Sequence, residues 1–502
     1  MLNNLRIVKN TVYLYFRMII ILLVSLYTSR IVLDVLGAED YGIYGIVGSI
    51  VVLFTFLSNS MTGASQRFFS YELGKEQNTQ IVETFSVSLI AHLIIIFIVF
   101  FLCETIGVWY LNNKLNIPED RITAAMVVFQ LSVATFTFNV IRIPYNAIIV
   151  SHERMSFFAY LSIIEIILKL LVVFLLKTST FDKLIYYGVL ILIVTILCTI
   201  INIIYCILQF RECRSRFIWD YVIFRKMLSF TSWSFCGNMA NVAAQHGGNV
   251  VLNYFFNVVV NASYAIANQV SAAIYGFVSN FQMAFRPQIT KLYASNNKIE
   301  LWKLVCNSSK YSFYLLLLIA VPFIVNSSFI LSLWLKEVPD YCVEFCNIII
   351  LYFLIDAIQA PLWMVIDATG KIKEYSIWLS LILFCNLPIS FIILKMGGNA
   401  SSLIWVRVTL NLLTAIIRTL YLRSFIGFPM YPYIKQCVKC LFVFLISFVF
   451  AYISKIFIND NPFEQIILLA ISFIITILIV GYIGISKEER NNIINMVLRK
   501  YR

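Results

Sequence analysis

The sequence predicts an all-α polytopic membrane protein, and its composition together with the spacing of its apolar residues carries this prediction. Of the 502 residues, 61% are hydrophobic and only 13% are charged, and the mean hydropathy is +0.87. Soluble domains are far more polar than this. Long apolar runs alternate with short connectors, and about 20 apolar residues suffice for one membrane-spanning helix. The chain therefore has room for many spans and for little else.

About 14 transmembrane helices fit this pattern, with limits that a single sequence defines only to within several residues. The first apolar run is too long for a cleavable signal peptide and no small-residue cleavage site follows it, so we expect it to remain as a span. An even number of spans places both termini on the same side of the membrane. The spans are predicted near residues 11–36, 42–62, 81–108, 122–143, 157–177, 184–210, 231–256, 262–285, 304–332, 342–366, 375–394, 402–424, 438–458 and 464–484.

The net charge of +13 lies mainly in the connectors, which favours a role in membrane orientation over nucleic-acid binding. If the N-terminus is cytoplasmic, the connectors on that side carry about 24 Lys and Arg residues and those on the other side about 7. This asymmetry is the one that the positive-inside rule describes. We therefore expect the connector Arg211–Lys226 to be cytoplasmic, the connector Asn112–Arg121 to lie on the outer side, and both termini to be cytoplasmic.

Motifs for metal binding and for ATP hydrolysis are missing from the sequence. The eleven cysteines are scattered, and the pair Cys437 and Cys440 has no second pair or histidine near it in sequence, so we expect no metal site. No glycine-rich Lys-Ser/Thr phosphate loop occurs, and no connector exceeds about twenty residues, which excludes ATP hydrolysis by the chain itself. We expect no cofactor, no catalytic residue and no enzymatic activity.

A weak internal repeat divides the chain. The segment Gly37–Ile43 is echoed by Asn261–Ile266, and Pro144 near the end of one predicted span is echoed by Pro361 in another. Both echoes are separated by six predicted helices, which indicates two parallel repeats such as those of two-lobed transporters. The prediction is two six-helix lobes plus two extra C-terminal helices. The expected division is 1–215 for the N-terminal lobe, 216–430 for the C-terminal lobe, and 431–502 for two extra helices and a basic cytoplasmic tail.

Polar side chains recur on one face of four predicted spans, the second, seventh, eighth and twelfth. Such residues often form hydrogen bonds between packed helices, worth about 0.6 kcal/mol each, and for any single residue this is the better interpretation. Four long stripes are more than packing needs, so they predict helices that line a wet cavity. The residues predicted to line it are Asn59, Gln66, Asn241, Gln245, Asn268, Gln282 and Asn411.

Four arginines within predicted spans are candidate substrate-binding cations. Arg407 and Arg418 are eleven residues apart, within about 20° of one helix face, so they can address one cavity at two depths. Arg17 and Arg30 point to faces about 220° apart on a straight helix. Both cannot line the same cavity without a bend, and the spacing does not choose between them.

Carboxylates within spans are candidates for ion coupling, because a charge at membrane depth is costly without a function. Asp34 and Asp356 are the predicted ion-coupling residues, for either a proton or a sodium ion. Asp34 lies four residues after Arg30, where a helix would pair them, so a structural role weighs about equally. Glu165 and Lys169 have the same spacing, and there a structural pair is the favoured interpretation.

Three motifs carry a resemblance to a known family: Leu36–Tyr44 after the first span, Asn116–Arg121 after the third, and Arg142–Ala147 leading to Ser151–Met155. At these residues the sequence resembles the Wzx-type O-antigen and capsule flippases. They form the polysaccharide-export branch of the multidrug/oligosaccharidyl-lipid/polysaccharide flippase superfamily. The motifs are characteristic of the family without being catalytic.

The resemblance implies a V-shaped, two-lobed transporter that works by alternating access in the bacterial inner membrane. Its expected substrate is an undecaprenyl-pyrophosphate-linked oligosaccharide, flipped from the cytoplasmic to the periplasmic leaflet for O-antigen, and hence lipopolysaccharide, biosynthesis. Membrane lipid and polysaccharide assembly enzymes are the expected partners. The resemblance also implies a positive side chain on the cavity-facing first helix, here Arg17 or Arg30.

The residues themselves agree with such a substrate, because arginine matches phosphate oxygens while Asn, Gln and Tyr replace the water around a glycan. Two alternatives remain. A drug/cation antiporter of the same superfamily would favour a carboxylate-lined cavity, and here the embedded Asp34, Glu165 and Asp356 do not outnumber the cations. A polysaccharide polymerase or ligase would need a large periplasmic loop, but the longest outer connector has about a dozen residues. The sequence does not identify the glycan, the coupling ion or the oligomeric state.

Overall fold

The computed structural model of the protein describes residues 13–21, 24, 27–28, 31–32, 34–37, 40, 43–44, 47, 51, 55–75, 80–114, 118–214, 218–256, 258–335, 338–457 and 461–491. Within these ranges every regular element is a helix and no strand occurs, which confirms the predicted all-α fold. Ten helical stretches of the described chain are long and apolar enough to cross a membrane. The chain divides into two compact units.

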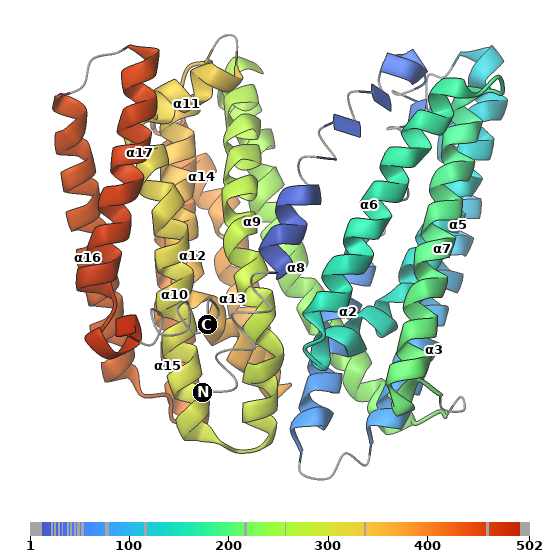
Figure 1. Ribbon diagram of the computed structural model, residues 1–502, viewed down its shortest axis with the longest axis horizontal. Coiled ribbons are helices and arrows are strands. Elements are labelled where there is room, and N and C mark those ends of the chain that lie inside the picture. The colour runs from blue at the N-terminus through green and yellow to red at the C-terminus, as the bar shows by residue number, and fades with distance from the viewer. Residues whose placement is uncertain are drawn as a thin grey trace, which may run out of the picture. The chain divides into compact units, whose positions relative to one another are not determined.

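Unit 1 comprises Met1–Phe235 together with Thr290–Asn296. Its core is built around α5, which packs against α7, α2 and α3, while α6 packs against α7. Figure 1 shows α5, α6 and α7 running side by side. The helices are α2 (Thr55–Gly74), α3 (Ile81–Leu102), α4 (Val108–Lys114), α5 (Ile122–Ser151), α6 (Met155–Thr178), α7 (Lys183–Gln209) and the first part of α8 (Tyr221–Phe255).

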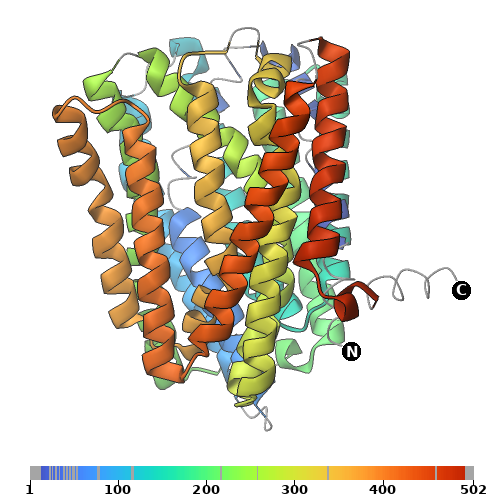
Figure 2. The same ribbon diagram turned by 90° about the vertical axis from the view of Figure 1, so that its left-hand side faces the viewer.

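Unit 2 comprises Cys236–Ile289 together with Asn297–Arg502. Helix α10 packs against α12, α16 and α17, and α12 also packs against α15. The last two helices, drawn in red, stand side by side (Figure 2). They expose large apolar side chains such as Phe442 and Phe473, as lipid-facing helices do. The helices are α9 (Val258–Ala294), α10 (Lys298–Val325), α11 (Ser327–Trp334), α12 (Cys342–Thr369), α13 (Lys373–Phe384), α14 (Asn386–Lys395), α15 (Ser402–Ile426), α16 (Met430–Ile456) and α17 (Pro462–Ile479).

The ends of these helices follow from local residue chemistry. Asn297 caps α10, because its side-chain oxygen accepts the backbone N–H of Glu300 at 3.2 Å. Helices α12 and α15 end at Gly370 and Gly427, whose φ angles of 73° and 76° are left-handed and suit glycine at a helix C-terminus. The sequence therefore determines where the spans that carry the polar side chains stop.

Both prolines of the predicted repeat are buried residues inside long helices, Pro144 in α5 of unit 1 and Pro361 in α12 of unit 2. The unit boundaries fall inside two further helices, between Phe235 and Cys236 in α8 and between Ile289 and Thr290 in α9. The division predicted at residues 215 and 430 stays a prediction.

Candidate functional site

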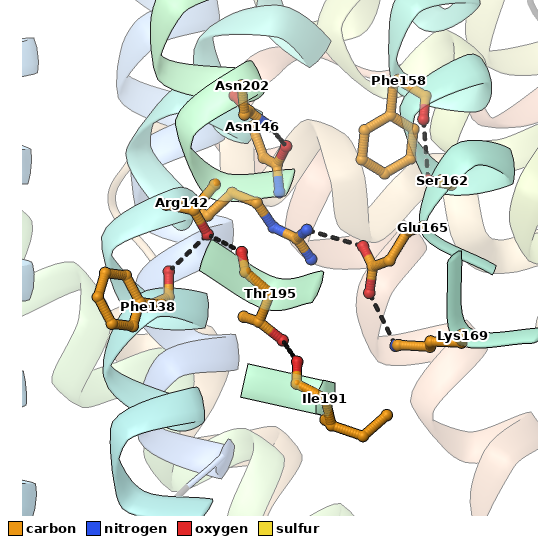
Figure 3. A network of polar contacts seen from close by, with 11 residues as sticks. Phe138, Arg142, Asn146, Phe158, Ser162, Glu165, Lys169, Ile191, Thr195 and Asn202 are labelled. Carbon is orange, nitrogen blue, oxygen red and sulfur yellow. Dashed lines mark hydrogen bonds and ion pairs between the residues drawn. The ribbon is translucent and has the colours of Figure 1, made fainter. Parts of the chain in front are cut away.

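In unit 1, a charged cluster joins α5 to α6. Arg142 on α5 donates from Nη1 to Glu165 Oε2 at 2.7 Å, and Lys169 on α6 donates from Nζ to Glu165 Oε1 at 2.8 Å. Figure 3 shows the carboxylate of Glu165 between the two cations. The side chains of Arg142, Glu165 and Lys169 are 17%, 19% and 36% exposed, so the cluster is partly buried.

Arg17 in the first helical segment belongs to the same cluster. Its Cζ lies 4.6 Å from the ring centroid of Phe158, which is seven residues, or about two helical turns, before Glu165 on α6. The guanidinium is close enough to Glu165 and Arg142 for their charges to act on it. Its Nε is buried and has no hydrogen-bond partner in the described part of the chain. This unit 1 cluster, defined as Arg17, Arg142, Glu165 and Lys169, thus holds three cations and one carboxylate.

The polar side chains near Arg142 form hydrogen bonds with one another or with the backbone. Asn202 on α7 donates to Asn146 Oδ1 on α5 at 2.6 Å, as Figure 3 shows. Thr199 on α7 donates to the carbonyl of Thr195 at 2.8 Å. No hydrogen bond from these side chains to Arg142 is present among the described contacts. The guanidinium therefore keeps donors beyond the one that Glu165 uses.

In unit 2, Arg418 on α15 lies in the interior of the helix bundle. It donates from Nε to the Tyr375 hydroxyl on α13 at 2.8 Å and from Nη1 to Gln359 Oε1 on α12 at 3.0 Å. Gln359 in turn faces Asn411, whose side chain donates to the carbonyl of Tyr352 at 3.3 Å. Arg418 is 6% exposed, and both of its hydrogen-bond acceptors are neutral.

Arg407, three turns before Arg418 on the same helix, is equally buried at 6% exposure. Its Cζ lies 4.3 Å from the ring centroid of Tyr352, and its Nη1 is buried without a hydrogen-bond partner among the described residues. Neither arginine forms a salt bridge with a carboxylate of the described chain. Two positive charges are therefore held by phenol and amide groups.

Asp356 lies on α12 between Tyr352 and Gln359, two residues of the same helix that contact Arg407 and Arg418 respectively. It accepts a hydrogen bond from the Tyr275 hydroxyl on α9 at 2.8 Å, and Tyr275 also lies 3.3 Å from Gln282 Oε1. The Asp356 charge acts on Arg418 without a direct contact. The unit 2 cluster, defined as Arg407, Arg418, Asp356 and these neutral partners, thus holds two cations and one carboxylate.

Comparison with known proteins identifies the family. The family described as polysaccharide biosynthesis protein matches residues 7–293, more than half of the chain. The chain belongs to the polysaccharide biosynthesis protein family. No curated protein matches the sequence at a significant level.

Solved structures of MATE transporters share the fold of this polysaccharide biosynthesis protein. A MATE protein in the bent conformation aligns with a TM-score of 0.70 at 14% identity, covering 84% of this chain and 95% of its own. An outward-facing multidrug resistance MATE transporter of the MOP superfamily gives 0.69 at 14%, covering 83% and 95%. The MATE transporter ClbM in complex with Rb+ gives 0.69 at 14%, covering 82% and 94%. At these identities the likeness concerns the fold alone.

Four other predicted site residues of this polysaccharide biosynthesis protein, Asn268, Asn59, Asp34 and Gln66, are described by the structure and belong to neither cluster. Asn268 bonds within its own helix to the carbonyl of Tyr264 at 3.0 Å. Asn59 and Asp34 are exposed, and Gln66 is half-buried. Arg30 and the side chains of Asn241 and Gln245 lie outside the described residues. In the described chain, no group of three His, Cys, Asp or Glu side chains could hold a metal ion.

Sequence reasoning missed several members of both clusters. Arg142 lies in the predicted span 122–143, so an arginine at membrane depth was the available signal. Its partner Glu165 is on another helix, and no spacing along the chain reveals that contact. The same holds for Tyr352, Gln359 and Tyr375, which surround the two arginines of α15.

Proposed function

We propose that this polysaccharide biosynthesis protein is a flippase for an undecaprenyl-pyrophosphate-linked oligosaccharide repeat unit. It carries the unit from the cytoplasmic to the periplasmic leaflet of the bacterial inner membrane by alternating access, with both termini in the cytoplasm. The family match supports a role in polysaccharide biosynthesis, and the fold is one that MATE transporters also have. The lipid-linked saccharide, membrane lipid and the enzymes of polysaccharide assembly are its proposed partners.

The observation that carries this proposal is the pair of buried arginines on α15. Placing an arginine at the centre of a membrane-spanning helix costs about 2.5–3.5 kcal/mol on insertion scales. Arg407 and Arg418 bear this cost with neutral partners only in the described chain, and Arg407 keeps an unpartnered Nη1. A pyrophosphate group supplies the missing negative charge, and its oxygens match the fork of a guanidinium.

The neutral hydrogen-bond partners of Arg418 also favour anion binding. Tyr375 and Gln359 fix the orientation of Arg418, so less side-chain entropy is lost when an anion binds. The two arginines lie about 16 Å apart along α15 at 1.5 Å per residue. That separation allows the pyrophosphate to pass from one guanidinium to the other during the transport cycle.

A drug/cation antiporter is the second candidate, because one structure of similar fold is a multidrug resistance transporter. The charge of the two clusters disfavours it. Among the described residues, the unit 1 cluster has three cations and one carboxylate, and the unit 2 cluster has two cations and one carboxylate. A cationic substrate would be repelled by both clusters, whereas an anionic one is attracted.

Export of the glycan tests the proposal in a bacterial strain that depends on this protein. We expect Arg407→Gln and Arg418→Gln to reduce surface glycan at least about tenfold, with lipid-linked precursor accumulating inside, because each loses a charge and a fork. Arg418→Lys keeps the charge and is expected to retain part of the activity. Arg423→Gln is the matched control, since Arg423 lies exposed at the end of the same helix and should tolerate the change.

Protein abundance in the membrane separates function from folding. The proposal requires normal abundance with low export, whereas a purely structural role lowers both together. Wild-type export by a well-expressed Arg407→Gln, Arg418→Gln double variant contradicts the proposal. Retained efflux of cationic drugs by that variant would favour the antiporter.

We also propose that an embedded carboxylate couples transport to a proton or sodium gradient. Asp356 is the better-placed candidate, because it lies in the unit 2 cluster beside Tyr275, whereas Asp34 is exposed. Asp356→Asn is expected to abolish the dependence of export on the ion gradient, and Asp34→Asn to leave it. Gradient-driven uptake into vesicles measures this, and unchanged ion dependence in both variants would remove both residues from the mechanism.

A further inference from the structure

We propose that Arg17, Arg142 and Lys169 form a second anion site inside unit 1, and that Glu165 is its resident counter-anion, displaced when the substrate's phosphate binds. This inference rests on the proposed function for the identity of the anion, a pyrophosphate group. Its physical basis is the unit 1 cluster alone, and unit 2 plays no part in it.

The charge of the cluster is the first argument. Three cations share one carboxylate among the described residues, so an excess of two positive charges lies within predicted membrane spans. Charges at membrane depth face protein or a water-filled cavity and are paired there. Neighbouring polar groups do not supply the missing negative charge, because Asn146, Asn202 and Thr199 are neutral and bond one another or the backbone. An anionic ligand does.

The geometry around Glu165 is the second argument. One carboxylate oxygen accepts from Arg142 and the other from Lys169, at 2.7 and 2.8 Å. These two cations are therefore already held at the spacing of two oxygens bonded to one central atom, which a phosphate also presents. Arg142 uses only Nη1 in this contact, and so keeps Nη2 and Nε for further acceptors.

Arg17 is the third argument, because it is held beside the cluster without being neutralised. The face of Phe158 supports its guanidinium by a cation–π contact, which fixes a charged group without cancelling its charge. Its buried Nε has no partner among the described residues. A phosphate that replaced Glu165 at Arg142 would find this additional donor close by, which the shorter carboxylate does not use.

A structural ion-pair network is the alternative, and the two interpretations predict opposite effects of one substitution. If Glu165 only stabilises the helix pair, Glu165→Gln leaves two sheltered cations unpaired, destabilises unit 1 and creates no better anion site. If Glu165 is the resident counter-anion, Glu165→Gln removes a competitor and anion binding becomes tighter. A carboxylate that belongs to a binding site is thus recognised by a gain of affinity when it is removed.

The test is a titration of the purified full-length protein with inorganic pyrophosphate, in which isothermal titration calorimetry measures the affinity at constant ionic strength. It is done in the Arg407→Gln, Arg418→Gln background, so that the unit 2 cluster does not contribute. We expect Glu165→Gln to tighten binding by about threefold to tenfold, and Arg142→Gln and Arg17→Gln to weaken it by at least about tenfold. Arg142→Lys keeps the charge and should retain most of the binding.

Glu104→Gln is the matched control for the gain. Glu104 is in unit 1 and bonds the neutral Gln130 at 3.2 Å, so the same loss of charge should leave pyrophosphate binding within about twofold. Size-exclusion chromatography and thermal unfolding establish that each variant is folded. A folded Glu165→Gln protein that binds pyrophosphate no more tightly than its parent overturns the proposal, and so does an equal gain in Glu104→Gln.

The outcome is separable from that of the proposed function. Failure of the flippase proposal appears as normal glycan export without Arg407 and Arg418, and the opposite effects of Glu165 and Arg142 on pyrophosphate binding would still be measurable. Failure of the second site appears in the titration, while export would still depend on Arg418.

Discussion

At the residue scale, Arg121 and Asp182 tie together three segments of unit 1. Arg121 donates from Nη1 to Asp182 Oδ2 at 2.6 Å and from Nε to Asp40 Oδ1 at 2.9 Å. Asp182 also caps α7, since its Oδ1 accepts the backbone N–H groups of Leu184 and Ile185 at 3.1 Å. One carboxylate thus serves a helix terminus and an arginine at once, and its negative charge favours both contacts.

These contacts hold the pKa of Asp182 below its ordinary value. Partial burial raises that pKa, but the hydrogen bonds from the Ile185 N–H, from Arg121 and from the Leu184 N–H outweigh it. Because the folded-state pKa is the lower one, the carboxylate contributes its full stability above the unfolded-state pKa. That contribution is lost as the pH falls through the folded-state value.

Replacing Asp182 with asparagine should therefore make the protein less sensitive to acid. At neutral pH the variant keeps a side-chain oxygen for the cap and loses no more than about 1 kcal/mol. Thermal unfolding of purified wild type and Asp182→Asn between about pH 6 and about pH 3 measures the effect, with the larger fall in melting temperature expected for the wild type. An equal fall in both proteins would show that Asp182 does not contribute to acid sensitivity.

Pairs within one helix could be predicted from the sequence, and pairs between helices could not. The spacing of Glu165 and Lys169 predicted their contact, which the distance of 2.8 Å confirms. The contact of Glu165 with Arg142 depends on how α5 and α6 pack, and no period along the chain encodes it. For the same reason the sequence placed Arg407 and Arg418 on one face but did not identify Tyr352, Gln359 and Tyr375 as the groups around them.

At the scale of elements, helix α9 begins in unit 2, and its last turn belongs to unit 1. The helix contains Pro287, and its last turn, from Thr290, belongs to unit 1. There Lys291 Nζ contacts Glu153 Oε1 at 2.7 Å. A Cβ added to Gly74 at the end of α2 would lie only 2.5 Å from the carbonyl oxygen of Lys291, so the two backbones are in close contact.

Gly74→Ala should therefore disturb this turn. The added methyl group meets backbone atoms that cannot rotate away, and we expect a loss of about 1–3 kcal/mol of stability. Gly276→Ala in α9 is the control, because a Cβ added at Gly276 has no neighbour within 4 Å. It should be neutral or stabilising by up to about 1 kcal/mol. Thermal unfolding of both variants makes the comparison, and equal melting temperatures would mean that the turn shifts freely.

Hydropathy predicted the presence of the helices better than the residues at which they end. Two spans were predicted at residues 231–256 and 262–285, and two separate helices lie there, but α8 already begins at Tyr221 and α9 continues to Ala294. Polar residues extend both helices beyond their apolar parts, and a hydropathy window does not count polar residues as part of a span. The predicted span 304–332 likewise comprises α10 and α11, which meet at Asn326 after Pro322.

At the scale of the whole molecule, the fold class could be predicted with ease because composition alone excludes a soluble domain. The spacing of Pro144 and Pro361 along the sequence also indicated two related halves, and one of these prolines lies in each unit. The unit boundaries could not be predicted, because both lie within continuous helices, α8 and α9, where no loop and no change of composition marks them.

The orientation of the molecule in the membrane remains a prediction that labelling can test. Asn113 and Trp219 are exposed residues of the described chain, in the connectors predicted to be outer and cytoplasmic. In a variant whose exposed Cys236 and Cys385 are replaced, Asn113→Cys should react with a membrane-impermeant maleimide on intact cells. Trp219→Cys should react only after lysis. The reverse pattern would invert the topology.

The two boundaries inside α8 and α9 also bear on how such proteins can recombine. A crossover in either helix joins half of it to a half with a different sequence, so packing on both sides of the joint must fit at once. A crossover in a connector instead transfers a complete helix, including the turn that holds Lys291 against Glu153 and Gly74. A recombinant protein that inherits α9 must therefore also inherit Glu153 and Gly74, or it loses their contacts with Lys291.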